Sequence, residues 1–334
     1  MAPPPSGRAW RETLLQEVDQ LIVARRAEAD AIRHAQKGAS SPAESRQAIR
    51  TLLGWPLADF VSQPSREAEE TPAVEDDLGK VLRLRISTLP GVSTYALLCL
   101  PPGPGPFPCV IAQHGGLGTP EMLLGLTGNS ENYRNFGRRL RARGFAVLAP
   151  QLCLSWGADW GPKRDQIDLE NSLRHLGGSL AALETTRILR CLDYLDAHPA
   201  IATGRIGMAG LSYGGFYTLI AAALDVRIRA AYCSCFLNHR YTYPWGDLVW
   251  RGSAFQFLDA EIATLIAPRP LYADIGLSDE VFLSDGVPPV ADEIKDAFRR
   301  AGSVENFVFQ AREGGHEFDP ADGPLDFLQE NLAG

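Results

Sequence analysis

Gly210-Leu211-Ser212-Tyr213-Gly214 is the stretch of sequence that decides the fold. It follows a short apolar run at 205–209 and precedes an apolar, helix-forming run at 215–224. A serine at a sharp turn between a strand and a helix, with glycine two positions away on each side, is typical of a nucleophile held in a strained conformation. Larger side chains at the two glycines would collide with neighbouring backbone. The sequence therefore predicts that Ser212 is a nucleophile.

The segments around this turn alternate between strand and helix patterns. Apolar runs of the buried-strand type lie at 109–112 and 145–149, and further strands are predicted at 205–209, 228–235, 270–275 and 305–310. Helical patterns lie at 131–143, at 166–198 with an interruption near Gly177-Gly178, at 215–224, at 289–301 and at 324–332. Such alternation favours right-handed crossovers and an α/β fold, with a mostly parallel twisted sheet flanked by helices. Its active site is expected outside the carboxyl ends of the strands.

The first 75 residues have a different pattern. Apolar residues at helical spacing predict helices at 9–37 and 43–53, and the acidic, proline-containing residues 64–78 are typical of an exposed connector. A hairpin turning near Pro90-Gly91 follows. We therefore expect an N-terminal helical extension at 1–75 and a catalytic domain at 76–334. The extension could brace that domain, cap its pocket or form a dimer contact.

A serine hydroxyl needs a base to remove its proton, and His316 is the best of six histidines. It lies in the glycine-rich loop after the last predicted strand. His34, His175 and His198 lie on or at the ends of predicted helices and are expected at the surface or as caps. His239 follows a strand end and is expected, at most, to line the pocket.

The third catalytic group should orient His316 and stabilise its charged form. Asp279 follows the strand at 270–275, and the order serine, aspartate, histidine is the order expected for this kind of site. Asp274, Glu280 and Asp285 are rivals, and Asp274 is expected to be structural because it lies within the strand itself.

An oxyanion hole needs two backbone N–H groups. Tyr213, directly after the nucleophile, is expected to supply one. Gly116, in the loop after the strand at 109–112, is expected to supply the other. His114 in the same loop is expected to brace the loop and not to react.

The composition excludes several classes of protein. With a net charge of −8 and a pI near 5.3, the 334-residue chain shows no concentrated basic face for nucleic acid. It has no apolar run long enough to span a membrane and no apolar signal-peptide segment at its start, so a soluble cytoplasmic protein is expected. The six cysteines lack metal-ligand spacing and are expected to be mostly buried free thiols, with no metal and no cofactor.

Four motifs occur in an order that resembles a known family. They are His114-Gly115-Gly116, Gly210 to Gly215, Ala267-Pro268-Arg269-Pro270 and Gly314-Gly315-His316-Glu317-Phe318. Over about residues 80–330 the chain resembles the dienelactone-hydrolase-like and acetyl-xylan-esterase-like branch of the α/β-hydrolases. The resemblance implies an α/β-hydrolase fold, with a triad of Ser212, Asp279 and His316 and oxyanion roles for Gly116 and Tyr213. Many carbohydrate-acting relatives are exported, and the missing export signal weighs against a polysaccharide substrate.

The expected activity is cleavage of a small carboxylic ester through an acyl-enzyme. Aromatic side chains after two strand ends are expected to bind the substrate, namely Trp156, Trp160, Tyr243 and Trp245. An alternative is that these aromatic residues pack under the N-terminal extension. A peptidase, an amidase or an acyltransferase would use the same triad, and a non-catalytic binding protein with this fold is a further alternative. A homodimer is also left open.

Overall fold

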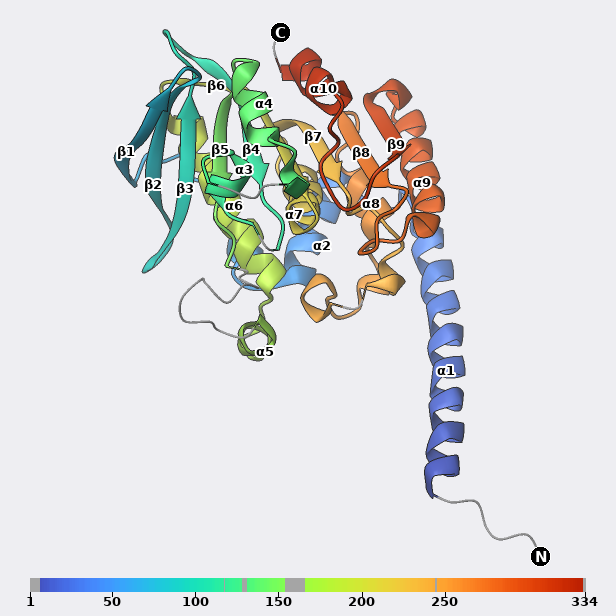
Figure 1. The fold of residues 1–334 in the computed structure, drawn as a ribbon. Coiled ribbons are helices and arrows are strands. Elements are labelled where there is room, and N and C mark those ends of the chain that lie inside the picture. The colour runs from blue at the N-terminus through green and yellow to red at the C-terminus, as the bar shows by residue number, and fades with distance from the viewer. Residues whose placement is uncertain (1–6, 117, 128–130, 154–165, 244, 333–334) are drawn as a thin grey trace, which may run out of the picture.

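A twisted nine-stranded sheet forms the centre of the molecule (Figure 1). The computed structural model describes residues 7–116, 118–127, 131–153, 166–243 and 245–332. Across the sheet the strand order is β1-β2-β3-β5-β4-β6-β7-β8-β9. The first three strands are antiparallel, β3 joins β5 antiparallel, and all pairs from β5 to β9 are parallel. The strands are β1 Ala68–Asp76, β2 Gly79–Leu89, β3 Val92–Leu100, β4 Phe107–Gln113, β5 Ala146–Pro150, β6 Ile201–Leu211, β7 Ile228–Ser234, β8 Leu271–Gly276 and β9 Phe307–Arg312.

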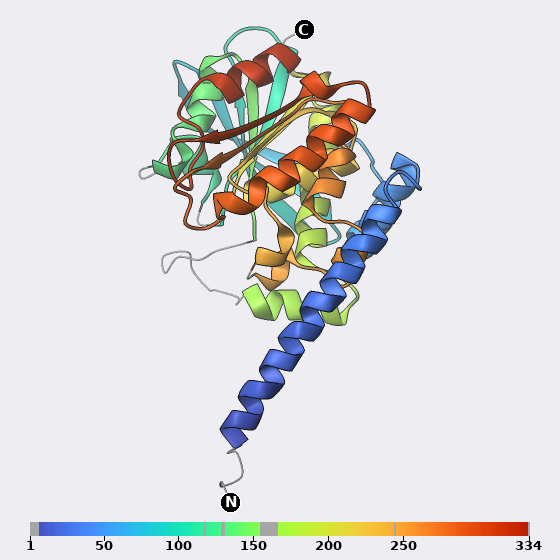
Figure 2. The ribbon, with the colours of Figure 1, turned by 90° about the vertical axis from the view of Figure 1, so that its right-hand side faces the viewer.

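Helices cover both faces of the sheet (Figures 1 and 2). They are α1 Gly7–Ala35, α2 Pro42–Leu53, α3 Pro120–Leu123, α4 Phe136–Ala142, α5 Gln166–His175, α6 Leu180–Ala197, α7 Tyr213–Leu224, α8 Asp259–Thr264, α9 Val287–Arg300 and α10 Gly323–Leu332. On one face α4 and α10 lie side by side, and Arg143, directly after α4, pairs with Asp322, which precedes α10, and with Asp326 on α10. On the other face α7 packs on β6 and β7, with α2 against α6 and α7.

The predicted α/β-hydrolase fold is confirmed. Strands β5, β7 and β8 are almost entirely buried, as continuous apolar runs in a parallel sheet should be. The interruption of the helix at 166–198 is also confirmed, because α5 ends at His175 and α6 begins at Leu180. Among the residues that the structure describes, no helix is long and apolar enough to cross a bilayer.

The exposed connector predicted at 64–78 is wrong for most of its length. Residues 68–76 form β1, the edge strand of the sheet, paired antiparallel with β2. Its side chains are largely exposed and acidic, so the strand lacks the apolar alternation that would have revealed it. The register shifts between Pro72 and Val74, where proline lacks the N–H that a continuous ladder needs.

The helix predicted at 9–37 is confirmed as α1, but most of it does not pack on the body. Only Ala29 and Arg33 of this helix are buried. Figures 1 and 2 both show its N-terminal part projecting as a straight rod beyond the other elements. The prediction for the cysteines is confirmed with one exception: all six are free and five are buried, whereas Cys153 is exposed.

Candidate active site

Ser212 occupies a strained turn between β6 and α7. Its backbone has φ +60° and ψ −121°, a region that residues with a side chain rarely adopt. A Cβ atom on Gly210 would lie 2.2 Å from the Gly214 carbonyl carbon, and one on Gly214 would lie 2.2 Å from the Gln113 carbonyl oxygen. The predicted reason for the two glycines is therefore confirmed. The turn holds Ser212 at the carboxyl edge of the sheet, at the N-terminus of α7.

His316 and Asp279 come together from the loops after β9 and β8. The His316 Nδ1 atom lies 2.8 Å from Asp279 Oδ2. Burial would raise the pKa of the Asp279 carboxyl, but the hydrogen bond and charge of His316 outweigh it and hold this pKa below its usual value. The N–H groups of Val281 and Phe282 help, since each donates to Asp279 Oδ1 at 2.8 Å. Asp279 is thus kept ionised and fixed, and Nε2 of His316 is left for the pocket.

The loop that carries His316 is held from inside the protein. Arg312, at the end of β9, donates from Nε to Asp274 Oδ2 at 2.9 Å and also donates to the carbonyl oxygens of Glu313 and Glu317. Asp274 is fully buried and also accepts a hydrogen bond from Tyr232. Asp274 therefore has the structural place that the sequence suggested, and its ion pair fixes both ends of the His316 loop.

The loop after β4 lies against the serine turn. Gly116 lines the same cavity as Ser212, and a Cβ atom on neighbouring Gly115 would lie 3.3 Å from Ser212 Cβ. The Gly115 N–H donates to the Tyr133 hydroxyl at 3.1 Å. At the other side of the serine, Tyr213 is the first residue of α7 and lines the same cavity. The backbone at Gly116 and Tyr213 thus borders the serine from two directions.

His114 braces this loop, as the sequence indicated. Its Nε2 accepts the Leu152 N–H at 3.0 Å, so Nδ1 carries the proton and donates to the Gly115 carbonyl at 2.7 Å. Burial lowers the pKa of His114 to about 4, which keeps the ring neutral. The ring therefore ties the glycine loop to the segment after β5.

A cavity of about 390 Å³ opens in front of Ser212 and His316. Its walls are mainly apolar, and the sequence reasoning missed six of the lining residues: Met122, Glu131, Asn132, Tyr133, Val281 and Phe282. Phe282 could have been considered, because it lies three residues after Asp279. Its ring stacks on the His316 ring with centroids 5.7 Å apart.

The four aromatic residues expected to bind substrate have different positions. Trp245 lines the cavity. Tyr243 does not line it: the side chain is buried, and its hydroxyl donates to Asp259 at 2.6 Å. The structure therefore does not bring Tyr243 to the pocket, because its hydroxyl is hydrogen-bonded to the buried Asp259 carboxylate. Trp156 and Trp160 lie outside the described residues.

One group of side chains has metal-like spacing. Ligand atoms of Cys235, Asp279 and His316 lie within 4.8 Å of one another. However, burial raises the pKa of the Cys235 thiol to about 12, and the thiol lies 3.3 Å from the Glu317 carbonyl, to which it can donate. A metal would need a thiolate there and would displace the bond between His316 and Asp279. The group fits a hydrogen-bond network better than a metal centre.

The fold and this site define the class: the chain has the α/β-hydrolase fold, like a set of solved esterase structures. A Bacteroides fragilis NCTC 9343 protein named as an acetyl xylan esterase superimposes with a TM-score of 0.67 at 16% identity, over 90% of this chain and 83% of the other. The methylesterase BT1017 superimposes with a TM-score of 0.62 at 21% identity, over 98% of this chain and 69% of the other.

A protein with a similar sequence has a name that specifies no substrate. YtaP of Bacillus subtilis (strain 168), a hydrolase by name alone, is 27% identical over 227 residues, which are 64% of this chain and 74% of YtaP. No family model matches the chain. The comparisons agree with the resemblance to acetyl-xylan-esterase-like α/β-hydrolases that the sequence motifs indicated.

Proposed function

We propose that the protein is a serine hydrolase that cleaves a small carboxylic ester. One observation carries the proposal: the strained Ser212 and His316 line one cavity, and Asp279 lies behind His316, hydrogen-bonded to its Nδ1, although the three residues come from three separate loops. A strained backbone at the serine costs free energy of folding, and such strain is typically found at functional sites. The names of the esterases that share the fold support the same reaction class.

The proposed mechanism gives each of these groups one role. His316 Nε2 accepts the Ser212 proton as the hydroxyl oxygen attacks the carbonyl carbon of the ester. Asp279 stabilises the imidazolium that forms. N–H groups of Gly116 and Tyr213 stabilise the tetrahedral oxyanion. The imidazolium then protonates the departing alcohol, and a water molecule activated by His316 hydrolyses the acyl-enzyme.

The cavity favours a neutral substrate with an apolar acyl or ring group. Met122, Trp245 and Phe282 provide apolar walls. Among the described lining residues, the one Asp, Glu, Lys or Arg side chain is Glu131, an acid. Binding an anionic substrate in such a cavity would bury its charge without a cationic partner, which is costly. We therefore expect acetyl and other short acyl esters of uncharged alcohols to be cleaved best.

The test is hydrolysis of p-nitrophenyl acetate by the wild type and by Ser212→Ala, together with labelling by a fluorophosphonate probe. We expect activity and labelling in the wild type and a loss of at least about 10³-fold in kcat in the variant. Undiminished hydrolysis by Ser212→Ala would contradict the proposal. A wild type that neither turns over esters nor reacts with the probe would favour the alternative of a non-catalytic binding protein.

The remaining alternatives use the same residues. Amide substrates and acceptor alcohols added to the assay distinguish an amidase, a peptidase and an acyltransferase from an esterase. An esterase should give free acid as the main product even when an acceptor alcohol is present.

A further inference from the structure

The N-terminal part of α1 has an apolar face that nothing in the described chain covers. We call residues 7–24 the α1 arm. Six large side chains on it form one stripe and are exposed by 39% to 69%: Trp10, Leu14, Leu15, Val18, Leu21 and Ile22. Most of the stability of a helix in a protein comes from packing its apolar face against a partner. Contiguous exposed apolar surface of this kind marks an interaction site.

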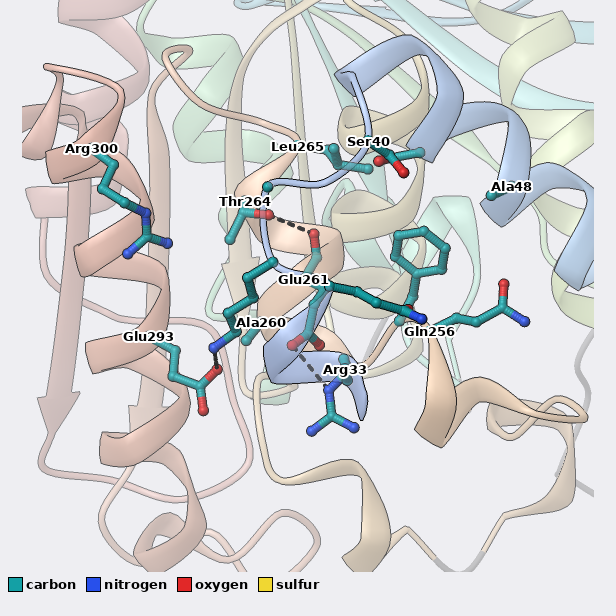
Figure 3. A pocket seen from close by; sticks show the side chains of 15 residues that line it. Arg33, Ser40, Ala48, Gln256, Ala260, Glu261, Thr264, Leu265, Glu293 and Arg300 are labelled. Carbon is teal, nitrogen blue, oxygen red and sulfur yellow. Dashed lines mark hydrogen bonds and ion pairs between the residues drawn. The ribbon is translucent and has the colours of Figure 1, made fainter. Parts of the chain in front are cut away.

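The C-terminal part of α1 fixes the direction of the arm. Arg33 donates to Glu261 at 3.0 Å, and Lys37, just after the helix, pairs with Glu293 at 2.8 Å (Figure 3). These contacts border a cavity of about 450 Å³ between the end of α1 and helices α8 and α9. Further along, the Arg25 guanidinium stacks over the Phe255 ring at 4.5 Å. The helix therefore leaves the body in one defined direction.

The body and the stripe use the same side of α1. At 100° per residue, Val18 and Ile22 lie on the helix face that also holds the buried Ala29. The body occupies this face beyond residue 25, where Phe255 and Tyr241 pack against it. A parallel partner helix that followed this face would run into the body. An antiparallel partner helix that overlaps only the arm would not run into the body, because the body of the second molecule would lie beyond the N-terminal end of the arm.

We propose that the partner is the α1 arm of a second copy of this chain, packed antiparallel about a two-fold axis. Six side chains exposed at about half of roughly 200 Å² each give on the order of 600 Å² per copy. The pair would then bury about 1,200 Å², the lower bound for specific, stable interfaces. Both partners offer the same stripe, as a two-fold interface requires.

The charges of the arm favour a protein partner over a lipid surface. The arm carries two arginines, Arg8 and Arg11, and three acids, Glu12, Glu17 and Asp19. Its net charge is therefore −1, whereas helices that lie on anionic bilayers have a strongly basic polar face.

The oligomeric state of the full chain tests the proposal. Sedimentation equilibrium of the wild type should give twice the 36.4 kDa chain mass. The double variant Val18→Glu with Leu21→Glu should halve the mass, because it places charges in the stripe. Gln16→Glu with Gln20→Glu adds the same charge on the opposite face and should remain dimeric. Ester hydrolysis and circular dichroism check that each variant is folded.

A wild type that stays at 36.4 kDa at all concentrations would overturn the proposal, whether or not it binds phosphatidylglycerol vesicles. A stripe variant that stays dimeric would also overturn it. The orientation has its own test, with spin labels at Ala9→Cys or Gln16→Cys in a Cys153→Ser background. Antiparallel arms place the two labels at residue 9 much farther apart than the two at residue 16. Equal separations would indicate parallel arms and would overturn the proposed packing.

Discussion

Arg312 on β9 and Asp274 on β8 form a buried ion pair, with Nε 2.9 Å from Oδ2, at the base of the loop that carries His316. The two residues lie on neighbouring parallel strands, two positions apart in register, because Asp274 is paired with Gln310 and Arg312 with Gly276. Burial raises the pKa of Asp274, and the charge of Arg312 opposes this shift. The guanidinium then extends to the carbonyl oxygens of Glu313 and Glu317, so one cation organises the backbone on both sides of His316.

Replacing Arg312 by methionine should therefore affect both folding and catalysis. Removing one partner leaves Asp274 buried and unpaired, so we expect a loss of about 3–5 kcal/mol in the free energy of unfolding. Urea denaturation measures this loss. Among molecules that stay folded, kcat should fall more than KM rises, because the His316 loop is no longer fixed. Arg312→Lys should restore part of the stability, and full activity in Arg312→Met would contradict the role of the loop contacts.

Asp279→Asn should lower kcat by about 10⁴-fold with little change in the free energy of unfolding. Asparagine can keep the hydrogen-bond geometry, but it neither stabilises the imidazolium nor fixes the required tautomer. Steady-state ester hydrolysis measures the effect. Asp285→Asn is the matched control, because Asp285 is exposed in the same loop region and should leave kcat unchanged. A variant of Asp279 with nearly normal kcat would remove it from the triad.

Gly214→Ala should destabilise the protein by roughly 3 kcal/mol, because the new Cβ would lie 2.2 Å from the Gln113 carbonyl oxygen. Moving that carbonyl would also shift the glycine loop next to Ser212. Thermal melting and ester hydrolysis should both report the change. Gly204→Ala is the control, since a Cβ there would meet nothing within 4 Å. Similar melting temperatures for the two variants would show that the turn tolerates more than the distances allow.

The buried neutral His114 should make stability depend on pH. Its folded-state pKa of about 4 lies below the roughly 6.5 of an unfolded histidine, so the unfolded chain binds more protons between these values. The free energy of unfolding should then fall by about 3 kcal/mol as the pH falls from 6.5 to 4. Denaturation of His114→Gln over this range should show a shallower pH dependence than the wild type. His175→Gln, at an exposed position, should leave the slope unchanged.

Much of the fold could be predicted because it depends on local patterns. Ser212, Asp279 and His316 each follow a strand of a parallel sheet, so the sequence order already placed them at one edge. β1 could not be predicted in this way, because most of its side chains face solvent and, among the described strands, it pairs with β2 alone. Its acidic composition is typical of a loop.

The details of the pocket depend on contacts between segments far apart in the chain. The sequence alone does not tell which of Tyr243 and Trp245 lines the pocket. In the structure the Tyr243 hydroxyl donates a hydrogen bond to the buried Asp259, whereas Trp245 lines the cavity. The ion pair between Arg312 and Asp274 joins residues 38 positions apart, and only the strand register brings them together. Such side-chain pairings depend on the tertiary fold, so hydrophobic periodicity alone does not contain them.

The acidic edge strand also affects how the molecules behave when they are crowded. Within the part of the chain that the structure describes, the outer side of β1 has no strand partner, and such an edge could extend the sheet of another molecule. Glu69, Glu70, Glu75 and Asp76 line this strand, and Pro72 interrupts its hydrogen-bonding pattern. An edge strand with charged side chains and a proline is a poor template for a further strand, so the sequence of β1 disfavours edge-to-edge pairing between molecules.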